Sequence, residues 1–357
     1  MQDFRKHFPA LNNQTYLNTP ASGLLSIPLY NWRKNKEADF LNHGNNYGNT
    51  LDLLADVKRK VAHFFSGFEE YTALVPNFSF GLNTVLEGLP EKQKVLLLQD
   101  DYPSVNWPVQ MRDFDVCIAK TTGNVEENIQ AAISKHRPDV FIFSIVQWLN
   151  GIKIDFEFLN ELKAYHPDIL LIADGTQYLG TEHFNFEESA IDILGTSTYK
   201  WLLSGYGNGF FLFKETVKEK VFPNTIGFNS AAGFDSTPEE TTFAKHFEPG
   251  HLDAFNFGSL RQSLQFMEEI GVNTIEEKIL SLNTKAKKAF VELNLLSETV
   301  INRTNISTIH NLKGDEAMFQ KLQDNNIVCS QRGGGIRVGF HFYNSEEDLE
   351  KLVSILQ

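Results

Sequence analysis

The chain has 357 residues, 42% of them hydrophobic and 22% charged, and its formal net charge is -13 at pH 7. This length and composition predict a globular protein with a large core, divided into one large and one smaller domain. The negative charge argues against nucleic-acid partners, because non-specific binding to phosphates requires a cationic surface.

The first 14 residues are predicted to form a polar arm, and they lack the apolar core of a secretory signal. The longest apolar stretch, Val140 to Leu149, is interrupted by polar residues and is too short to cross a bilayer, so no membrane partner is expected. Cys117 and Cys329 are the only cysteines, which argues against a disulfide framework. A cytoplasmic protein is the simplest interpretation.

Residues 43 to 49 are rich in Asn and Gly, which tolerate positive φ, and they predict a loop. Residues 52 to 65 then place apolar side chains at helical spacing and predict a helix with one buried face.

From residue 72, short apolar runs alternate with stretches of helical spacing. The predicted strands lie at 72–75, 94–98, 115–119 and 140–146, and the helices that follow them at 78–89, 103–112, 124–135 and 155–165. Repeated strand and helix units imply an α/β fold with a mostly parallel sheet and right-handed crossovers.

The segment from residue 169 to 213 carries the strongest functional pattern. An apolar run at 169–173 ends at Asp174, a second run at 190–195 leads to Lys200, and a glycine-rich turn at 205–209 precedes a third run. Short apolar runs bounded by glycine predict strands that are covered on both faces. The ligand crevice of such a sheet lies beyond the carboxyl ends of its strands, where we expect Asp174 and Lys200. The glycine-rich turn is not a dinucleotide loop, because a strand and not a helix is predicted after it.

A lysine among so many apolar residues is unusual, because removing an ammonium group from water is costly. A lysine that is partly neutral can form a Schiff base, and a nearby aspartate can keep a heterocyclic nitrogen protonated. Lys200 and Asp174 therefore predict a pyridoxal 5'-phosphate site. Each residue alone is also compatible with an ordinary solvated side chain. The order Asp174, Gln177, Ser197, Lys200 and a glycine-rich turn is more specific.

The C-terminal part predicts helices at 255–270 and 272–293, separated at Gly271, and strands at 306–309, 327–329 and 336–340. A capping-box-like start at residues 344–348 predicts the last helix. We expect residues 15–270 to form the large cofactor-binding domain, and residues 271–357 with residues 1–14 to form a smaller α+β domain.

These motifs resemble the class V aminotransferases, which are pyridoxal-phosphate enzymes of fold type I, the aspartate aminotransferase fold. Cysteine desulfurases, selenocysteine lyases, kynureninases and isopenicillin N epimerase-like proteins belong to this family. The resemblance runs from Tyr16 to Asn344. It implies an amino acid as the small-molecule substrate and a homodimer with shared active sites.

The resemblance also implies a role for individual residues. At the cofactor phosphate it places the Phe78 backbone, the hydroxyls of Ser79 and Ser197, Tyr199 and, from the other subunit, His251. At the cofactor ring it places Tyr102, Trp148 and Gln177 beside Asp174 and Lys200. At the substrate it places Arg337 on the carboxylate, with Asn18 and Ser22 in a facing turn and Arg332 as a second candidate anchor. Each has an ordinary alternative, such as a helix cap for Ser79, a structural role for His251, and wall or core for Trp148.

Two departures, at Tyr102 and at residues 331–335, argue against cysteine desulfurase activity, and a third, at Trp148, sets this chain apart from many relatives. Desulfurases have a histidine for acid-base work where this chain has Tyr102, and many relatives have an asparagine where it has Trp148. Residues 331–335 also run directly into Arg337, which leaves no room for the loop that carries a nucleophilic cysteine.

Transamination is the favoured reaction, with a β-lyase or an epimerase as alternatives that would use the same residues. A catalytically inactive binding protein of the same fold is an alternative from another class, and the presence of both Lys200 and Asp174 argues against it. No metal-binding motif is found, because the ten histidines are scattered and no paired-cysteine spacing occurs.

Overall fold

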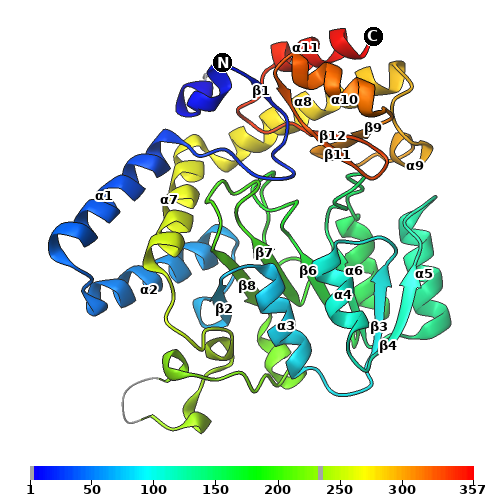
Figure 1. Ribbon diagram of the computed structural model, residues 1–357. Coiled ribbons are helices and arrows are strands. Elements are labelled where there is room, and N and C mark those ends of the chain that lie inside the picture. Colours follow the sequence, from blue (N-terminus) through cyan, green and yellow to red (C-terminus); the bar gives the residue numbers. More distant parts are fainter. Residues whose placement is uncertain (1–3, 232–235) are drawn as a thin grey trace.

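The centre of the molecule is a seven-stranded sheet with the strand order β2-β8-β7-β6-β5-β3-β4 (Figure 1). The structure is a computed structural model that describes residues 4–231 and 236–357. The strands of this sheet are β2 (Thr72–Val75), β3 (Lys94–Leu98), β4 (Asp115–Ala119), β5 (Val140–Ser144), β6 (Leu170–Asp174), β7 (Ile193–Ser197) and β8 (Gly209–Phe213). Strands β3 to β7 pair in parallel, and β8 is antiparallel to both of its neighbours. The predicted α/β fold with a mostly parallel sheet is therefore confirmed.

Four helices follow the strands as the sequence predicted. They are α3 (Phe78–Gly88), α4 (Pro103–Gln110), α5 (Val125–His136) and α6 (Phe156–Tyr165). Side chains of Asn77, Asn124 and Asp155 accept hydrogen bonds from the first turns of α3, α5 and α6. Such capping satisfies backbone N–H groups that a helix start leaves unpaired, so it fixes where each helix begins.

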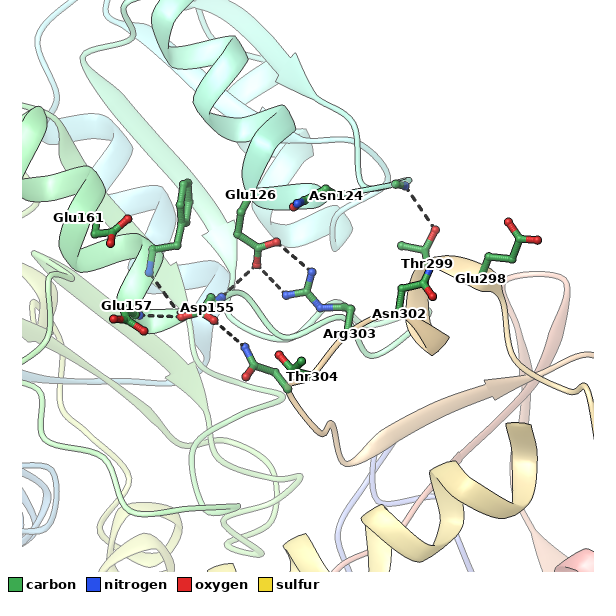
Figure 2. Close-up of a pocket in the computed structure, with 13 residues that line it drawn as sticks. Asn124, Glu126, Asp155, Glu157, Glu161, Glu298, Thr299, Asn302, Arg303 and Thr304 are labelled. Carbon is green, nitrogen blue, oxygen red and sulfur yellow. Dashed lines mark hydrogen bonds and ion pairs between the residues drawn. The ribbon is translucent and has the colours of Figure 1, made fainter. Parts of the chain in front are cut away.

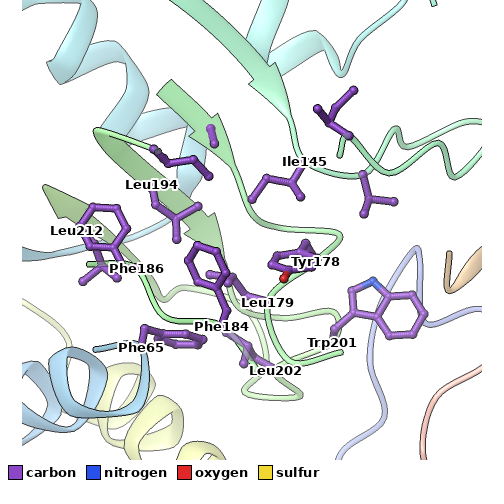
Figure 3. Close-up of a cluster of buried hydrophobic side chains, with 14 of the residues drawn as sticks. Phe65, Ile145, Tyr178, Leu179, Phe184, Phe186, Leu194, Trp201, Leu202 and Leu212 are labelled. Carbon is purple, nitrogen blue, oxygen red and sulfur yellow. The ribbon is translucent and has the colours of Figure 1, made fainter. Parts of the chain in front are cut away.

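Buried apolar side chains cover both faces of the sheet. Figure 3 shows part of the larger cluster, in which Trp201 and Leu202 of the loop after β7 lie among aromatic and aliphatic side chains. Burying one such side chain stabilises a fold by roughly 1.5–3 kcal/mol. The loop that carries Lys200 is thus anchored in the core on its C-terminal side.

The N-terminal part differs from the prediction in three ways. Within residues 4–14, which were predicted to be a polar arm, Phe4, Phe8 and Leu11 are buried against the body of the protein. A helix α1 (Ile27–His43) precedes α2 (Tyr47–Phe64), and the two project together as an arm (Figure 1). The predicted loop at 43–49 is partly wrong, because Asn46 accepts a hydrogen bond from the Asn49 N–H and starts α2 at Tyr47.

A smaller α+β unit packs over the carboxyl ends of the central strands (Figure 1). Its three-stranded sheet has the order β11-β12-β9, formed by β11 (Ser330–Arg332), β12 (Gly335–Gly339) and β9 (Ile309–Leu312). The strand predicted at 306–309 lies at 309–312, because Ile309 pairs with Gly339. A separate pair joins β1 (Thr15–Tyr16) to β10 (Ile327–Val328). The exact division into residues 15–270 and the remainder stays a prediction.

The remaining helices are α7 (Ala254–Ile270), α8 (Val272–Glu292), α9 (Glu298–Ile301), α10 (Glu316–Asp324) and α11 (Glu346–Leu356). Short 3-10 helices lie at Arg5–His7, Pro9–Asn12, Glu69–Tyr71, Glu215–Glu219, Phe228–Ser230, Pro238–Glu240 and Phe243–Phe247. Within the described residues, no helix is long and apolar enough to cross a membrane.

Candidate active site

Lys200 and Asp174 meet at the carboxyl edge of the central sheet. Asp174 is the last residue of β6, and Lys200 follows the end of the neighbouring strand β7. Each residue is only 5% exposed. The Lys200 Nζ atom lies 5.4 Å from the ring centre of Tyr102 and 5.6 Å from that of Tyr199. The structure therefore brings together the lysine, the carboxylate and the two aromatic residues that the sequence singled out.

Burial shifts both ionisable groups towards their neutral forms. Burial lowers the pKa of Lys200, Asp174 opposes the shift, and the charges of Arg337 and Arg332 add to it, so that the pKa is about 7. Burial also raises the pKa of Asp174, although the Thr176 N–H donates a hydrogen bond of 2.8 Å to its Oδ1 atom. A neutral amine near neutral pH is what a nucleophile or a general base requires.

The lowered pKa of Lys200 predicts how the cofactor-free protein reacts with an aldehyde. Only the neutral amine attacks a carbonyl, so the rate of covalent attachment of added pyridoxal phosphate should rise with pH and level off just above pH 7. Stopped-flow absorbance at a series of pH values measures this rate. A rate that still rises steeply near about pH 9 would indicate an ordinary lysine with a pKa near 10.4 and would contradict the assignment.

The lysine loop is held by the turn at residues 20–23. The Gly23 N–H donates to the Tyr199 carbonyl at 2.8 Å, and a Cβ atom on Gly23 would lie 2.2 Å from the Lys200 carbonyl oxygen. Gln177 joins the same contact, because its amide donates to the Pro20 carbonyl at 2.9 Å and accepts from the Trp201 indole at 2.9 Å. Gln177 thus positions the loop, and its predicted place at the cofactor's phenolic oxygen stays a prediction.

Three of the residues predicted for the phosphate, Phe78, Ser79 and Ser197, lie at the N-terminus of α3. The Phe78 N–H donates to the Ser197 hydroxyl at 2.9 Å, and the Ser79 hydroxyl donates to that of Ser104 at 2.8 Å. Tyr199 stacks on Tyr206 with ring centres 4.4 Å apart. Hydroxyl groups beside the positive end of a helix dipole suit a phosphate, so these residues fit the predicted cofactor.

Tyr102 and Trp148 form a wall beside Lys200, with their rings 5.4 Å apart and nearly perpendicular. The Trp148 indole N–H donates to the Asp100 carbonyl at 3.1 Å. An indole has no second donor, so Trp148 can contribute only its ring to a bound cofactor.

Two buried residues of the site were not predicted from the sequence. Asp101 lies three residues after β3 and accepts hydrogen bonds from the Ser144 N–H at 2.8 Å, the Ser144 hydroxyl at 2.6 Å and the Tyr102 N–H at 2.6 Å. Its burial raises its pKa, and its charge raises that of Asp174. Thr176 accepts from the Ser197 N–H at 3.0 Å and so links the loops that follow β6 and β7. A carboxylate after another parallel strand was the available signal for Asp101.

Arg337 on β12 is buried, with 3% of its surface exposed. Its Nη1 donates to the Trp148 carbonyl at 2.7 Å, whereas its buried Nε has no hydrogen-bond partner within the described chain. Burial and the neighbouring Arg332 lower the pKa of Arg337 to about 10. A buried guanidinium without a carboxylate partner is costly, so this site is suited to an anionic group of a ligand.

The remaining residues that were predicted for the site are Asn18, Ser22 and His251. Asn18 forms a parallel bridge with Gly339, and its buried Oδ1 has no hydrogen-bond partner in the described chain. Among the described residues, the Ser22 hydroxyl donates only to the carbonyl of Gly23, at 3.4 Å. His251 is exposed and contacts the rings of Tyr47 and Phe228. Its predicted phosphate contact across a subunit interface stays a prediction.

A cavity of about 720 Å³ lies elsewhere, between the starts of α5 and α6 and residues 298–305 (Figure 2). Arg303 crosses it and donates two hydrogen bonds to Glu126, of 2.7 and 2.9 Å. Neither Lys200 nor Asp174 lines this cavity, so its volume does not make it the active site. Among the residues that the structure describes, no three His, Cys, Asp or Glu side chains are grouped to hold a metal ion.

The sequence of this chain is similar to those of known proteins. Residues 42–352 match the family model described as "Aminotransferase class-V". The chain is 22% identical to an uncharacterized aminotransferase, YcbU of Bacillus subtilis, across 99% of this chain and 96% of that protein. It is also 22% identical to a probable cysteine desulfurase of Ureaplasma parvum, across 100% of this chain and 97% of the relative.

Solved structures of C-DES have the same fold. A mutant with glycine covalently linked to its pyridoxal phosphate (PLP) cofactor gives a TM-score of 0.87 at 19% identity and covers 99% of both chains. A complex of the same protein, described as a cystine C-S lyase with its product cysteine persulfide, gives a TM-score of 0.86 at 18% identity and covers 98% of both chains.

Proposed function

The chain belongs to the class-V aminotransferase family, and we propose that it transforms an amino acid with Lys200 as the cofactor-bearing general base and Asp174 as the partner of the cofactor ring. Pyridoxal phosphate is the cofactor of this enzyme. The observation that supports the proposal most strongly is the buried pair itself, a lysine with a pKa lowered to about 7 next to a carboxylate at the end of the adjacent strand. An inactive binding protein would not need to keep this costly pair buried.

Each step rests on a residue of the site. Arg337 binds the substrate carboxylate and orients the Cα–H bond towards Lys200. The neutral Lys200 amine removes the Cα proton and later returns it. The bound cofactor supplies an electron-withdrawing ring that stabilises the negative charge at Cα, and Asp174 keeps the ring nitrogen protonated. The rings of Tyr102 and Trp148 exclude water from one side of the site.

Transamination is the reaction we favour. Lys200 would move the Cα proton, after which water would release the substrate carbon skeleton as a 2-oxo acid while the amino group would stay with the cofactor. Direct release of a β-substituent is the second candidate, supported by the likeness of the fold to that of C-DES, a cystine C-S lyase. An epimerase would use the same residues with return of the proton to the opposite face of Cα.

A desulfurase that carries sulfur on its own cysteine is not supported. Strands β11 and β12 are joined by Gly333 and Gly334 alone, so no long loop precedes Arg337. Cys329 is buried in the smaller unit, and burial raises the pKa of its thiol to about 11. Such a thiol is a poor nucleophile near neutral pH.

A screen of amino acids with the holoenzyme tests the proposed reaction. Each amino acid is added while the absorbance of the bound cofactor is followed, and oxo acid, ammonia, alanine and sulfide are measured as products. An oxo acid formed stoichiometrically before a second oxo acid is added supports transamination, whereas ammonia or sulfide released in parallel supports a lyase. A cofactor spectrum that no amino acid changes would contradict both.

A homodimer is part of the proposal. The arm formed by α1 and α2 exposes large apolar side chains, among them Tyr30, Leu41, Tyr47 and Leu51. Exposed apolar patches of this kind usually mark interaction surfaces. A mass of about twice 40.6 kDa by light scattering is expected, and a mass near 40.6 kDa would contradict it.

Replacing Arg337 with glutamine tests the substrate anchor. Hydrogen bonds to charged groups contribute about 1.5–3 kcal/mol, so KM for the amino acid should rise roughly 10- to 100-fold with a smaller change in kcat. Arg337→Lys should recover only part of this loss, because an ammonium lacks the two-pronged geometry of a guanidinium. Arg137, which is exposed at the end of α5, provides a control, and Arg137→Gln should leave KM unchanged.

A further inference from the structure

The hairpin that carries Arg337 presents a second arginine on the same face. In the register of β11 and β12, Ser330 lies opposite Arg337 and Arg332 lies opposite Gly335. Residues directly opposite each other in an antiparallel pair point to the same face, and alternate residues along one strand do so too. Arg332, Ser330 and Arg337 therefore share one face of this hairpin.

This face is turned towards the end of the central sheet. Arg337 donates to the Trp148 carbonyl at 2.7 Å. Asn311 of β9, which pairs with Arg337 of β12, donates to the Leu149 carbonyl at 2.9 Å. The opposite face carries Ile336, which is buried in the core of the smaller unit. The charges of Arg332 and Arg337 both act on Lys200.

The turn fixes the position of Arg332. Gly333 and Gly334 have φ angles of 59° and 73°, a conformation that favours glycine and suits a tight two-residue hairpin. The Arg332 carbonyl accepts a hydrogen bond of 2.9 Å from Asn311. The backbone of Arg332 is thus held at the site while its side chain is exposed.

The charges on this face are not balanced by the protein. Across residues 4–231 and 236–357, neither Arg332 nor Arg337 forms an ion pair with a carboxylate. The buried Ser330 Oγ and Arg337 Nε also have no hydrogen-bond partner in that part of the chain. In a protein with a net charge of -13, this local excess of positive charge would attract anions.

One substrate carboxylate does not account for two such arginines. The residues that suit the cofactor phosphate follow β2 and β7, whereas the hairpin contacts residues that follow β5, and β6 lies between β7 and β5 in the sheet. The phosphate is therefore expected on the other side of Lys200 from Arg332. We therefore expect Arg332 to pair with a second anionic group of the ligand, in addition to the α-carboxylate that Arg337 binds.

We propose that Arg332 is a specificity-determining residue that binds a second acidic group of the substrate, so that the enzyme acts on amino acids with an anionic side chain. This inference rests on the proposed function, in which Arg337 binds the α-carboxylate. The Ser330 hydroxyl lies on the same face and can donate to either acidic group.

Two pairs of amino acids that differ in charge but hardly in shape test the inference. The holoenzyme is titrated with L-aspartate, L-asparagine, L-glutamate and L-glutamine, and the apparent Kd is read from the cofactor absorbance. The wild type should bind at least one acid about 10-fold or more tightly than its amide. Arg332→Gln should reduce that preference to within about 2-fold and leave binding of the amide within about 2-fold of the wild type.

The exposed Arg137 again provides the matched control, since Arg137→Gln removes the same charge from the end of α5 and should keep the preference. A wild type that binds amides as tightly as acids, or an Arg332→Gln variant that loses both equally, would overturn the inference and leave the proposed function standing. Failure of all four to change the cofactor spectrum, together with failure in the wider amino acid screen, would overturn both. A thermal melt of each variant with the wild-type midpoint shows that the fold is retained.

Discussion

Replacing Lys200 with alanine is expected to lower the turnover number by about 1,000-fold or more. The variant loses the general base, and acid-base groups of this kind contribute about 100- to 10,000-fold. It also loses the covalent attachment point of the cofactor. Steady-state rates with the best substrate from the screen measure the effect, and the cofactor absorbance of the purified protein reports the missing attachment.

The same substitution should stabilise the cofactor-free protein, which separates the catalytic role from a structural one. A lysine whose pKa is lowered on folding binds fewer protons than in the unfolded chain, so its burial opposes folding below its unfolded pKa. Removing it should raise the melting temperature of the apoprotein at pH 7. Lys288, which is exposed on α8, provides the control, and Lys288→Ala should change neither turnover nor melting. Wild-type turnover in the Lys200→Ala enzyme would contradict the assignment of Lys200 as the general base.

Replacing Asp174 with asparagine should lower turnover by about 100- to 1,000-fold while the cofactor stays covalently attached. The amide has nearly the same shape and can still accept the hydrogen bond from the Thr176 N–H, but it carries no negative charge to hold a ring proton. The loss should therefore fall mainly on kcat. Rates, together with the absorbance spectrum before and after substrate addition, measure it.

Asp168 offers a matched control for this second variant. It is exposed just before β6, at the opposite end of the strand that Asp174 closes, so Asp168→Asn removes the same charge far from the cofactor. Wild-type kinetics are expected for it. Equal losses in both variants would point to a general electrostatic effect and would remove the special role of Asp174.

The central sheet and the position of its active edge could be predicted because both depend on local sequence. Runs such as 169–173 are apolar throughout, as strands buried on both faces must be, and each ends at a polar residue that marks the carboxyl edge. Asp174 and Lys200 follow neighbouring parallel strands, so their proximity followed from the fold. The β7 strand nevertheless begins at Ile193 and not at residue 190, where the apolar run starts.

Features that depend on distant partners could not be predicted. Helix α1 buries only Leu29 among its residues, so it lacks the apolar spacing by which α2 was found. Two of the hydrogen bonds that Asp101 accepts come from Ser144 on another strand, and nothing near Asp101 in the sequence indicates them. The sequence marked Arg337 as a substrate anchor, but only the structure shows that its Nε has no partner in the described chain.

The most direct test of the central claim is to reduce the holoenzyme with borohydride, digest it and locate the cofactor by mass spectrometry. We expect a single modified peptide, with the added mass of the reduced pyridoxal phosphate on Lys200 and on no other lysine. A modification on a different lysine, or none at all in a protein that retains the cofactor's absorbance, would contradict it.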